Sequence, residues 1–259
     1  MFMSPFLQTA LDAALNAQEI ISHYYRQGVA VKLKADQTPV TVADIEAERA
    51  IKACILGMFP HHGFYGEETG RERADAEYVW LIDPIDGTKS FVRGYPFFST
   101  QIALMRDGEL VLGVSNAPEF QELAYAEKGL GAYLNQQPIQ VSHKEHLPEI
   151  TLSLGNLTTL TQGERWQGLG RLIQKVQRTR GYGDFYHYHL LASGRIDLVI
   201  ESDVNILDIA ALTMLVNEAG GVFTDLDGQP IGLETTSVLA AANPVLHDKA
   251  LRLLGIDED

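Results

Sequence analysis

The spacing of apolar residues predicts two helices at the start of the chain. Across residues 6–15, apolar side chains recur three and four positions apart, directly after a Ser-Pro pair, as in an amphipathic helix. Gly28 fits the end of this helix. A second helix is predicted from Thr41 to Phe59, and Thr41 with Asp44 resembles a capping arrangement.

Short β-type runs follow these helices, from Tyr78 to about Val141. They are separated by Asp-Gly, Asn-Ala-Pro and Lys-Gly turn signals, and the runs are VWLID, TQIALM, ELVLGVS and ELAYAE. This pattern predicts a mainly antiparallel sheet. The polar segment 142–150 comes next and contains Pro148, so we expect it to connect two halves of the chain.

Strand and helix signals alternate beyond residue 150, which is typical of an α/β arrangement. The expected strands are TLSLG, DLVIE and SVLAAAN, and the expected helices are ERWQGLGRLIQKV, the segment 184–193, ILDIAALTMLVNEAGG and PVLHDKALRLL. The predicted fold class is therefore α+β or α/β. We expect a first half at residues 1–142, with helices and an antiparallel sheet, and an α/β half at residues 150–259, packed as one compact unit.

The acidic charge balance narrows the classes of partner. The 259 residues carry a formal net charge of -14. Proteins that bind nucleic acid normally present a basic surface, and an anionic membrane also attracts basic segments. We therefore expect no nucleic acid and no membrane as partners. A phosphate ligand and so acidic a chain would repel each other, and a site built from carboxylates and divalent cations resolves this conflict, because the metal ions invert the local charge.

The sequence also limits covalent chemistry and location. A single cysteine, Cys54, excludes a disulfide within the chain and a cysteine-based zinc site. The N-terminal segment lacks the basic start of a signal peptide, and the chain contains no apolar run of about 18 residues for a membrane span. A cytoplasmic location is the default expectation.

The segment WLIDPIDGT combines features that suit both a metal ion and a phosphate group. An apolar strand runs into Asp83 and Asp86, Pro84 stops the strand, and Gly87 allows a tight turn. Thr88 can then begin a helix whose free N–H groups face an anion. Carboxylate oxygens are the ligands that Mg²⁺ prefers. By itself, however, an Asp-x-x-Asp-Gly sequence is more often an ordinary turn.

Three further acidic residues stand in suggestive places. Glu67 follows Gly66 and an apolar Phe-Tyr pair, and Asp44 lies at a predicted helix start. Each of these two, taken alone, is a solvated or capping acid. Asp208 is less ordinary, because a carboxylate in an otherwise apolar helix start is costly unless it is paired or bound to a metal ion.

Four segments together resemble the signatures of the inositol monophosphatase superfamily. In chain order they are PVTVAD, GEE, WLIDPIDGT and LDIAA with the following EAGG, from Pro39 to Gly221. The resemblance implies a layered αβαβα sandwich and a homodimer. It also implies a lithium-sensitive enzyme that hydrolyses a small phosphate ester with two or three Mg²⁺ ions, for which Mn²⁺ can substitute. Paired metal ions suit this chemistry because they can bind both the attacking water and the leaving oxygen.

The resemblance further implies a role for each matching residue. The implied metal ligands are Glu67, Asp83, Asp86, Asp208 and the backbone carbonyl of Ile85. The residues implied to orient and activate the attacking water are Glu67, Thr88 and Asp44. The phosphate group would be held by Asp86 and by the backbone amides of Gly87 and Thr88. Glu201, seven residues before Asp208, matches a position that contacts the alcohol part of the substrate.

Two passages resemble the histidinol-phosphate phosphatases of this superfamily. One is DGTKSF, which contains Lys89, and the other leads from Asp184 through LLASG to DLVIE. Histidinol phosphate carries a cationic amine and an imidazole, with which Asp184 and Glu201 can pair. Asp184 can equally be the N-cap of the helix that follows it. Leu207 stands where the family usually has Trp.

Other functions stay open from the sequence. An inositol-1-monophosphatase or a 3'(2'),5'-bisphosphate nucleotidase would use the same metal site, and the nucleotidase would need basic residues such as Lys89 and Arg93 near its second phosphate. A non-catalytic metal- or phosphate-binding protein on this fold would be expected to have lost a metal carboxylate or Thr88, and all are present. A domain that binds a basic partner through an acidic face is a third class.

Overall fold

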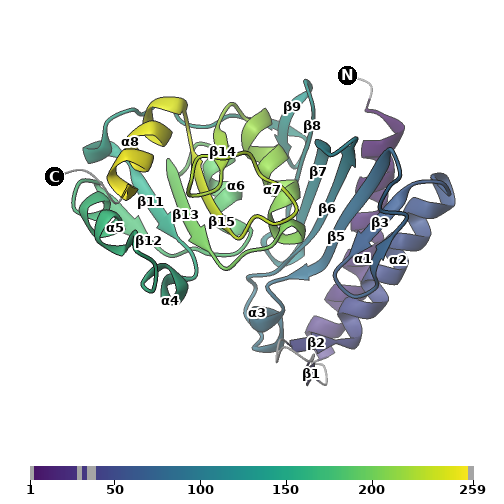
Figure 1. The fold of residues 1–259 in the computed structure, drawn as a ribbon. Helices are drawn as coiled ribbons and strands as arrows, with labels where there is room; N and C mark the ends of the chain where they lie inside the picture. Colours follow the sequence, from purple (N-terminus) through teal and green to yellow (C-terminus); the bar gives the residue numbers. More distant parts are fainter. Residues whose placement is uncertain (1–2, 28–30, 34–38, 256–259) are drawn as a thin grey trace. The chain divides into compact units, whose positions relative to one another are not determined.

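The computed structural model describes residues 3–27, 31–33 and 39–255 (Figure 1). The chain forms two compact units, Met1–Leu130 with Leu207–Met214 and Gly131–Ile206 with Leu215–Asp259. Residues 131–142 thus belong to the second unit, and part of a late helix belongs to the first. The domains expected at 1–142 and 150–259 stay a prediction. Among the described residues, no helix is long and apolar enough to cross a membrane.

The first unit contains two long helices and a large, mainly antiparallel sheet. Its elements are α1 (Pro5–Gln27), β1 (Val31–Leu33), β2 (Pro39–Thr41), α2 (Val42–Met58), β3 (Gly63–Gly66), β4 (Gly70–Glu72), β5 (Tyr78–Asp86), α3 (Thr88–Val92), β6 (Ser99–Arg106), β7 (Glu109–Ala117) and β8 (Glu122–Glu127). The large sheet runs β8-β7-β6-β5-β3-β4 through this unit, and β3 pairs with β5 in parallel. Helices α1 and α2 lie side by side against the sheet (Figure 1).

The helices and strands predicted for this region are confirmed. The Thr41 hydroxyl accepts a hydrogen bond from the backbone of Ala43 (3.1 Å), and the Asp44 carboxylate accepts one from the backbone of Thr41 (2.7 Å), which completes a capping box. The predicted end of the first helix at Gly28 lies outside the described residues. The sequence pattern does not reveal β3 and β4, because strands of four and three residues are too short for alternation to show.

A glycine in β7 allows a close approach between the sheet and α7 (Ile206–Glu218). A Cβ atom on Gly113 would lie 2.5 Å from the carbonyl oxygen of Ala211 and 2.7 Å from its Cα atom. Real Cβ atoms do not approach backbone so closely, so the position requires glycine. The segment Leu207–Met214, which carries Asp208, packs within the first unit. Gly113 therefore helps to fix a predicted metal ligand.

Aromatic side chains pack together in the first unit near the start of β5. The imidazole of His62 stacks on the rings of Phe59 and Tyr78 at centroid distances of 4.8 Å for both pairs. The indole N–H of Trp80, a fully buried side chain, donates to His62 Nδ1 (3.0 Å). Burial lowers the pKa of His62, and the neighbouring His61 lowers it further, against an opposing effect of Glu77.

This environment predicts that His62 makes stability depend on pH. Above the ordinary histidine pKa of about 6.5, the His62 ring is neutral in both the folded and the unfolded state. Its contacts then make their full contribution to the stability of the folded protein. Below a pH of about 6.5, His62 takes up a proton in the unfolded state before it does so in the folded state. This stabilises the unfolded state, so the contribution of His62 to folding stability is lost as the pH falls. Urea denaturation should therefore show a smaller loss of stability between pH 7.5 and pH 5.5 in His62→Phe than in the wild type. His23→Phe, on the exposed side of α1, is the control; equal losses in wild type and His62→Phe would contradict the prediction.

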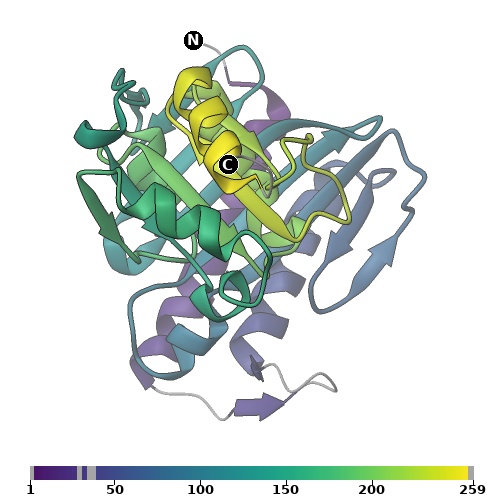
Figure 2. The same cartoon turned by 60° about the vertical axis from the view of Figure 1, so that its left-hand side comes forward.

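The second unit contains a mixed sheet flanked by helices. Its elements are β9 (Gly131–Leu134), β10 (Gln137–Ile139), β11 (Thr151–Leu154), α4 (Leu157–Leu160), α5 (Trp166–Ile173), β12 (Arg178–Arg180), α6 (Tyr186–Ala192), β13 (Leu198–Ser202), β14 (Val222–Thr224), β15 (Ser237–Ala241) and α8 (Pro244–Leu254). The sheet order is β12-β11-β13-β15-β14, with β11 parallel to both of its neighbours. Helices α5 and α8 pack together, as the turned view shows (Figure 2).

The predicted α/β alternation of this half is confirmed. Every predicted strand and helix is present, although α5 and α6 are shorter than their patterns suggest. As predicted, α7 ends at its two glycines: Gly220 has a φ of 94° and the N–H of Gly221 donates to the carbonyl of Val216 (2.9 Å). The short strands β12 and β14 are further elements that the sequence pattern does not reveal.

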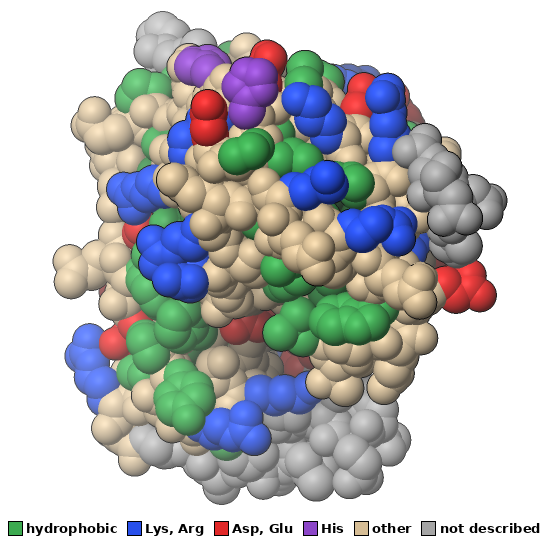
Figure 3. All heavy atoms as spheres, turned by 90° about the vertical axis from the view of Figure 1, so that its left-hand side faces the viewer, with side chains coloured by type: hydrophobic (Ala, Val, Ile, Leu, Met, Phe, Trp, Pro, Cys, Tyr) green, Lys and Arg blue, Asp and Glu red, His purple; other side chains and the backbone are tan. Residues whose placement is uncertain are grey.

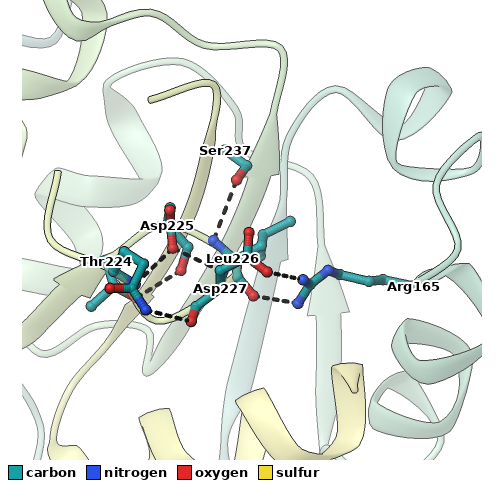
Figure 4. A network of polar contacts seen from close by, with 7 residues as sticks. Arg165, Thr224, Asp225, Leu226, Asp227 and Ser237 are labelled. Atoms are coloured by element: carbon teal, nitrogen blue, oxygen red, sulfur yellow. Dashed lines mark hydrogen bonds and ion pairs between the residues drawn. The ribbon is translucent and has the colours of Figure 1, made fainter. Parts of the chain in front are cut away.

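A polar network fastens the turn that follows β14 (Figure 4). Asp225 Oδ1 accepts hydrogen bonds from the backbone N–H groups of Asp227 (2.8 Å) and Gln229 (2.7 Å). Arg165 donates to the carbonyl of Leu226 and forms an ion pair with Asp227. The exposed turn is therefore tied to the segment before α5 by one arginine.

Figure 3 shows one face of the molecule as a surface. On this face, lysine and arginine side chains lie at several places, some of them next to one another, among acidic, apolar and other uncharged groups.

Candidate metal centre

The acidic motif of β5 lies where this strand departs from regular pairing with β6. The register shifts between Asp83 and Asp86, because Pro84 cannot donate to the ladder. The N–H of Ile85 instead donates to Asp83 Oδ1 (2.9 Å), and the Thr100 hydroxyl donates to the carbonyl of Pro84 (2.9 Å). The irregularity thus fixes both aspartates at the end of a buried strand.

Three carboxylates converge at this point. One oxygen from each of Asp83, Asp86 and Asp208 lies within 4.8 Å of the others, with Asp83 buried and the other two partly exposed. Burial raises the pKa of Asp83 well above its usual value, and the negative charges of Glu67, Asp86 and Asp208 raise it further. A hard divalent cation would remove this repulsion, so the oxygen donor set fits Mg²⁺ or Mn²⁺.

Glu67 lies beside this cluster but outside the group of three. Its backbone N–H donates to the carbonyl of Ile82 in β5 (3.1 Å), which ties the turn after β3 to the neighbouring strand. Among the acidic neighbours of Asp83, the charge of Glu67 has the largest effect in raising the pKa of Asp83. The carbonyl of Ile85, a predicted ligand, accepts a hydrogen bond from the Thr88 hydroxyl (2.9 Å). The roles of both residues as metal ligands stay predictions.

Asp44 and Thr88 come together although they are far apart in the chain. Asp44 Oδ2 accepts from the backbone and the hydroxyl of Thr41 (2.7 and 2.6 Å), while Oδ1 faces the Thr88 hydroxyl at 3.3 Å. Burial raises the pKa of Asp44, the Thr41 hydrogen bonds oppose this, and the charge of Glu67 adds to the rise. Asp44 therefore both closes the capping box of α2 and neighbours the acidic cluster.

Gly87 makes the turn that leads from the acidic motif into α3. It is the N-cap of α3 with a φ of 89°, and a Cβ atom there would lie 2.5 Å from the carbonyl oxygen of Phe97. The first amides of a helix have no partner within the helix. The backbone of Gly87 and Thr88 can thus donate to a phosphate oxygen, and this role stays a prediction.

The two predicted substrate contacts belong to the second unit. Glu201 in β13 is buried and its Oε2 accepts from the Tyr188 hydroxyl (2.7 Å) and lies 3.1 Å from His187 Nε2. Asp184 has a φ of 45°, and the N-cap of α6 is Phe185, with no side-chain cap. The alternative that Asp184 is the cap of this helix is therefore wrong, while its contact with substrate stays a prediction.

The sequence reasoning misses one residue that contacts the site. Glu48 of α2 is fully buried, and its carboxylate accepts from the backbone N–H groups of Glu68 (2.7 Å) and Thr69 (2.8 Å). Its spacing of one helical turn from Asp44 was a signal, because residues four apart share a helix face.

Comparison with known proteins identifies the class to which this site belongs. The model of the inositol monophosphatase family matches residues 3–256, and the chain belongs to this family. It is 36% identical over 242 residues to a histidinol-phosphatase of Chlorobaculum parvum, covering 93% of both chains. It is 33% identical over 258 residues to an inositol-1-monophosphatase of Mesorhizobium japonicum, covering 97% of both.

Solved structures agree with this assignment. The extragenic suppressor protein suhB of Bartonella henselae superimposes with a TM-score of 0.89 at 30% identity, covering 97% of this chain and 98% of that one. The predicted inositol monophosphatase type of fold is thereby confirmed. The protein is a metal-dependent phosphoric monoester hydrolase of this family, and a small phosphate ester is its type of substrate.

Proposed function

We propose that the protein is a Mg²⁺-dependent histidinol-phosphate phosphatase. The observation that carries the metal-dependent part is the convergence of Asp83, Asp86 and Asp208 within 4.8 Å. The substrate part is supported by the DGTKSF motif, by the passage from Asp184 to Glu201, and by the likeness to a histidinol-phosphatase.

In this proposal, the three clustered aspartates and Glu67 hold the divalent cations, and the carbonyl of Ile85 is a further ligand. When bound there, such cations would supply a lowered pKa for the attacking water and would neutralise the charge that develops on the leaving oxygen. The chain's own contribution is to hold its acidic groups in place before the substrate arrives, so that little reorganisation is needed during the reaction.

Thr88 and Asp44 orient the attacking water in the proposed mechanism. The Thr88 hydroxyl has one proton, which it can donate either to the carbonyl of Ile85 (2.9 Å) or to Asp44 Oδ1 (3.3 Å). In both arrangements its lone pairs can accept a hydrogen bond from a water molecule. Asp44 cannot rotate freely, because Thr41 holds its other oxygen, so the water meets a fixed acceptor. Glu67 is the proposed base that takes the water's proton.

Asp184 and Glu201 are the proposed contacts of the cationic alcohol part of the substrate. Both hydrogen bonds from Tyr188 and His187 end on Oε2 of Glu201, which leaves Oε1 to pair with an ammonium or imidazolium group. A charge-assisted hydrogen bond is worth about 1.5–3 kcal/mol. An uncharged polyol would gain less from these two carboxylates.

A panel of phosphate esters tests the proposed function. Histidinol phosphate, inositol 1-phosphate and adenosine 3',5'-bisphosphate would be incubated with the protein with and without Mg²⁺, and phosphate release measured. We expect phosphate release only when Mg²⁺ is present. We also expect kcat/KM for histidinol phosphate to exceed that for the other two esters by about 10–100-fold, which corresponds to the free energy of one charge-assisted hydrogen bond. No turnover of any ester would contradict the phosphatase, and a preference for inositol phosphate would assign the second function that the relatives carry.

The variant Glu201→Gln separates substrate choice from chemistry. It keeps the shape of the side chain and an oxygen acceptor for Tyr188 but removes the charge. We expect it to lower kcat/KM for histidinol phosphate about tenfold and to leave the rate with inositol 1-phosphate nearly unchanged. Equal losses for both substrates would show that Glu201 does not select the cationic group.

A further inference from the structure

Glu48 is a buried acid that the proposed mechanism does not use. It lies in α2, one turn after Asp44, and has no exposed surface. Its two oxygens are engaged separately: Oε2 accepts from the backbone N–H of Glu68 (2.7 Å), and Oε1 accepts from that of Thr69 (2.8 Å). A buried carboxylate is costly unless such bonds compensate it, so its presence calls for a reason beyond packing.

The loop that receives these bonds is shaped around the Glu48 carboxylate. A Cβ atom on Gly66 would lie 2.5 Å from the carboxyl carbon of Glu48 and 2.5 and 2.7 Å from its two oxygens. Glycine at this position therefore lets the loop backbone approach the acid. On the other side, the backbone N–H of Glu67 donates to the carbonyl of Ile82 in β5 (3.1 Å). The peptide units around Glu67 are thus held from two sides, by α2 and by β5.

We propose that Glu48 is a positioning residue, which fixes the loop Gly66–Thr69 so that the Glu67 carboxylate faces the acidic cluster. This inference rests on the proposed function, in which Glu67 holds a cation. Because the same helix carries Asp44, whose carboxylate faces the Thr88 hydroxyl, α2 sets the position of the water-orienting pair and of the ligand loop together. Residues that orient metal ligands typically change metal affinity by 10–100-fold when replaced.

The first test compares the metal-free wild type with the metal-free Glu48→Gln variant. Each protein is titrated with Mn²⁺, and the free ion is measured by electron paramagnetic resonance. The amide keeps the shape of the side chain but turns an N–H₂ group toward one of the two backbone donors. We expect Mn²⁺ to bind about 10–100-fold more weakly to this variant, and the Mg²⁺ concentration for half-maximal phosphatase activity to rise by a similar factor. With saturating Mg²⁺, kcat should stay within a few-fold of the wild type.

Glu46→Gln is the matched control. Glu46 lies on the same helix but is exposed, and it accepts a hydrogen bond from the Tyr24 hydroxyl (2.9 Å). It loses the same charge, so unchanged Mn²⁺ binding in this variant would show that the loss of one acidic charge from α2 does not explain the effect.

Gly66→Ala tests the same contact without changing any charge. Its Cβ atom would displace the Glu48 carboxylate from the loop, and the variant should weaken Mn²⁺ binding in the same direction. If both replacements disrupt the same contact, their effects on Mn²⁺ affinity should not multiply. The double variant should then bind Mn²⁺ about as weakly as whichever single variant has the lower affinity. Should Glu48→Gln fail to fold, Gly66→Ala alone decides.

The outcomes separate this inference from the proposed function. A wild type that binds Mn²⁺ but hydrolyses no ester would defeat the proposed function, while the Mn²⁺ titration would still decide the role of Glu48. A Glu48→Gln variant with a lower melting temperature but wild-type Mn²⁺ affinity would overturn the inference, because Glu48 would then support the fold without positioning the ligand loop.

Discussion

Asp83→Asn is expected to lower kcat/KM by about three orders of magnitude, because a metal ion supplies several kcal/mol of transition-state stabilisation and each 1.4 kcal/mol is a factor of ten. Asp83 is the buried member of the group of three carboxylates. The amide keeps an oxygen that can accept from the N–H of Ile85, so the turn should be preserved. The loss should therefore reflect weaker metal binding rather than a changed fold.

The same replacement should make the metal-free protein more stable. Burial and three acidic neighbours raise the pKa of Asp83, so holding it ionised costs free energy of folding. This cost is absent below the ordinary aspartate pKa of about 3.9 and grows as the pH rises from there to the raised pKa. Asparagine mimics the protonated acid, so the metal-free variant should unfold at a higher temperature than the metal-free wild type at pH 7.5.

Thermal unfolding with and without Mg²⁺ tests both halves of this prediction. The wild type should gain about 2.7 kcal/mol when Mg²⁺ is present at a hundred times its dissociation constant, and the variant should gain much less. Asp12→Asn, at an exposed position of α1 that accepts from Gln8, is the control and should behave as the wild type. An Asp83→Asn variant with full activity and a normal response to Mg²⁺ would refute the assignment of Asp83 to the metal centre.

Gly113→Ala is expected to damage both stability and the site, although glycine 113 carries no chemistry. The added Cβ atom would lie 2.5–2.9 Å from the Ala211 backbone, so the segment of α7 that carries Asp208 must move away from β7. Overpacking of this kind costs about 1–3 kcal/mol. Because Asp208 would move away from Asp83 and Asp86, Mn²⁺ affinity should fall about tenfold or more, as a misplaced ligand weakens the site.

Gly57→Ala is the matched control for this variant. Gly57 lies exposed near the end of α2, and a Cβ atom there would meet nothing within 4 Å. The same replacement should therefore be neutral or stabilise by about 0.5–1 kcal/mol, since alanine is the better helix former. Urea denaturation and a Mn²⁺ titration would be run on both variants. Wild-type stability and affinity in Gly113→Ala would show that the close approach of β7 and α7 does not position Asp208.

Much of the fold follows from local pattern. The apolar spacing of α1, the capping box at Thr41 and the two glycines that end α7 are local signals, and the structure contains each of them. The strands β3, β4, β12 and β14 escape the pattern because three or four residues are too few to establish a period. Asp184 illustrates a different limit, because an N-cap depends on backbone angles that the residue type does not fix.

The sequence by itself determined the chemistry of this protein: which acids are available, that two of them end a buried strand, and that a tight turn into a helix follows them. The tertiary structure alone decided how these groups meet. Asp208 joins Asp83 and Asp86 because a missing side chain at Gly113 lets α7 approach β7. Glu48 holds the loop of Glu67 because Gly66 leaves room for its carboxylate. Such contacts depend on distances between segments remote in the chain, and no local pattern of residues encodes those distances.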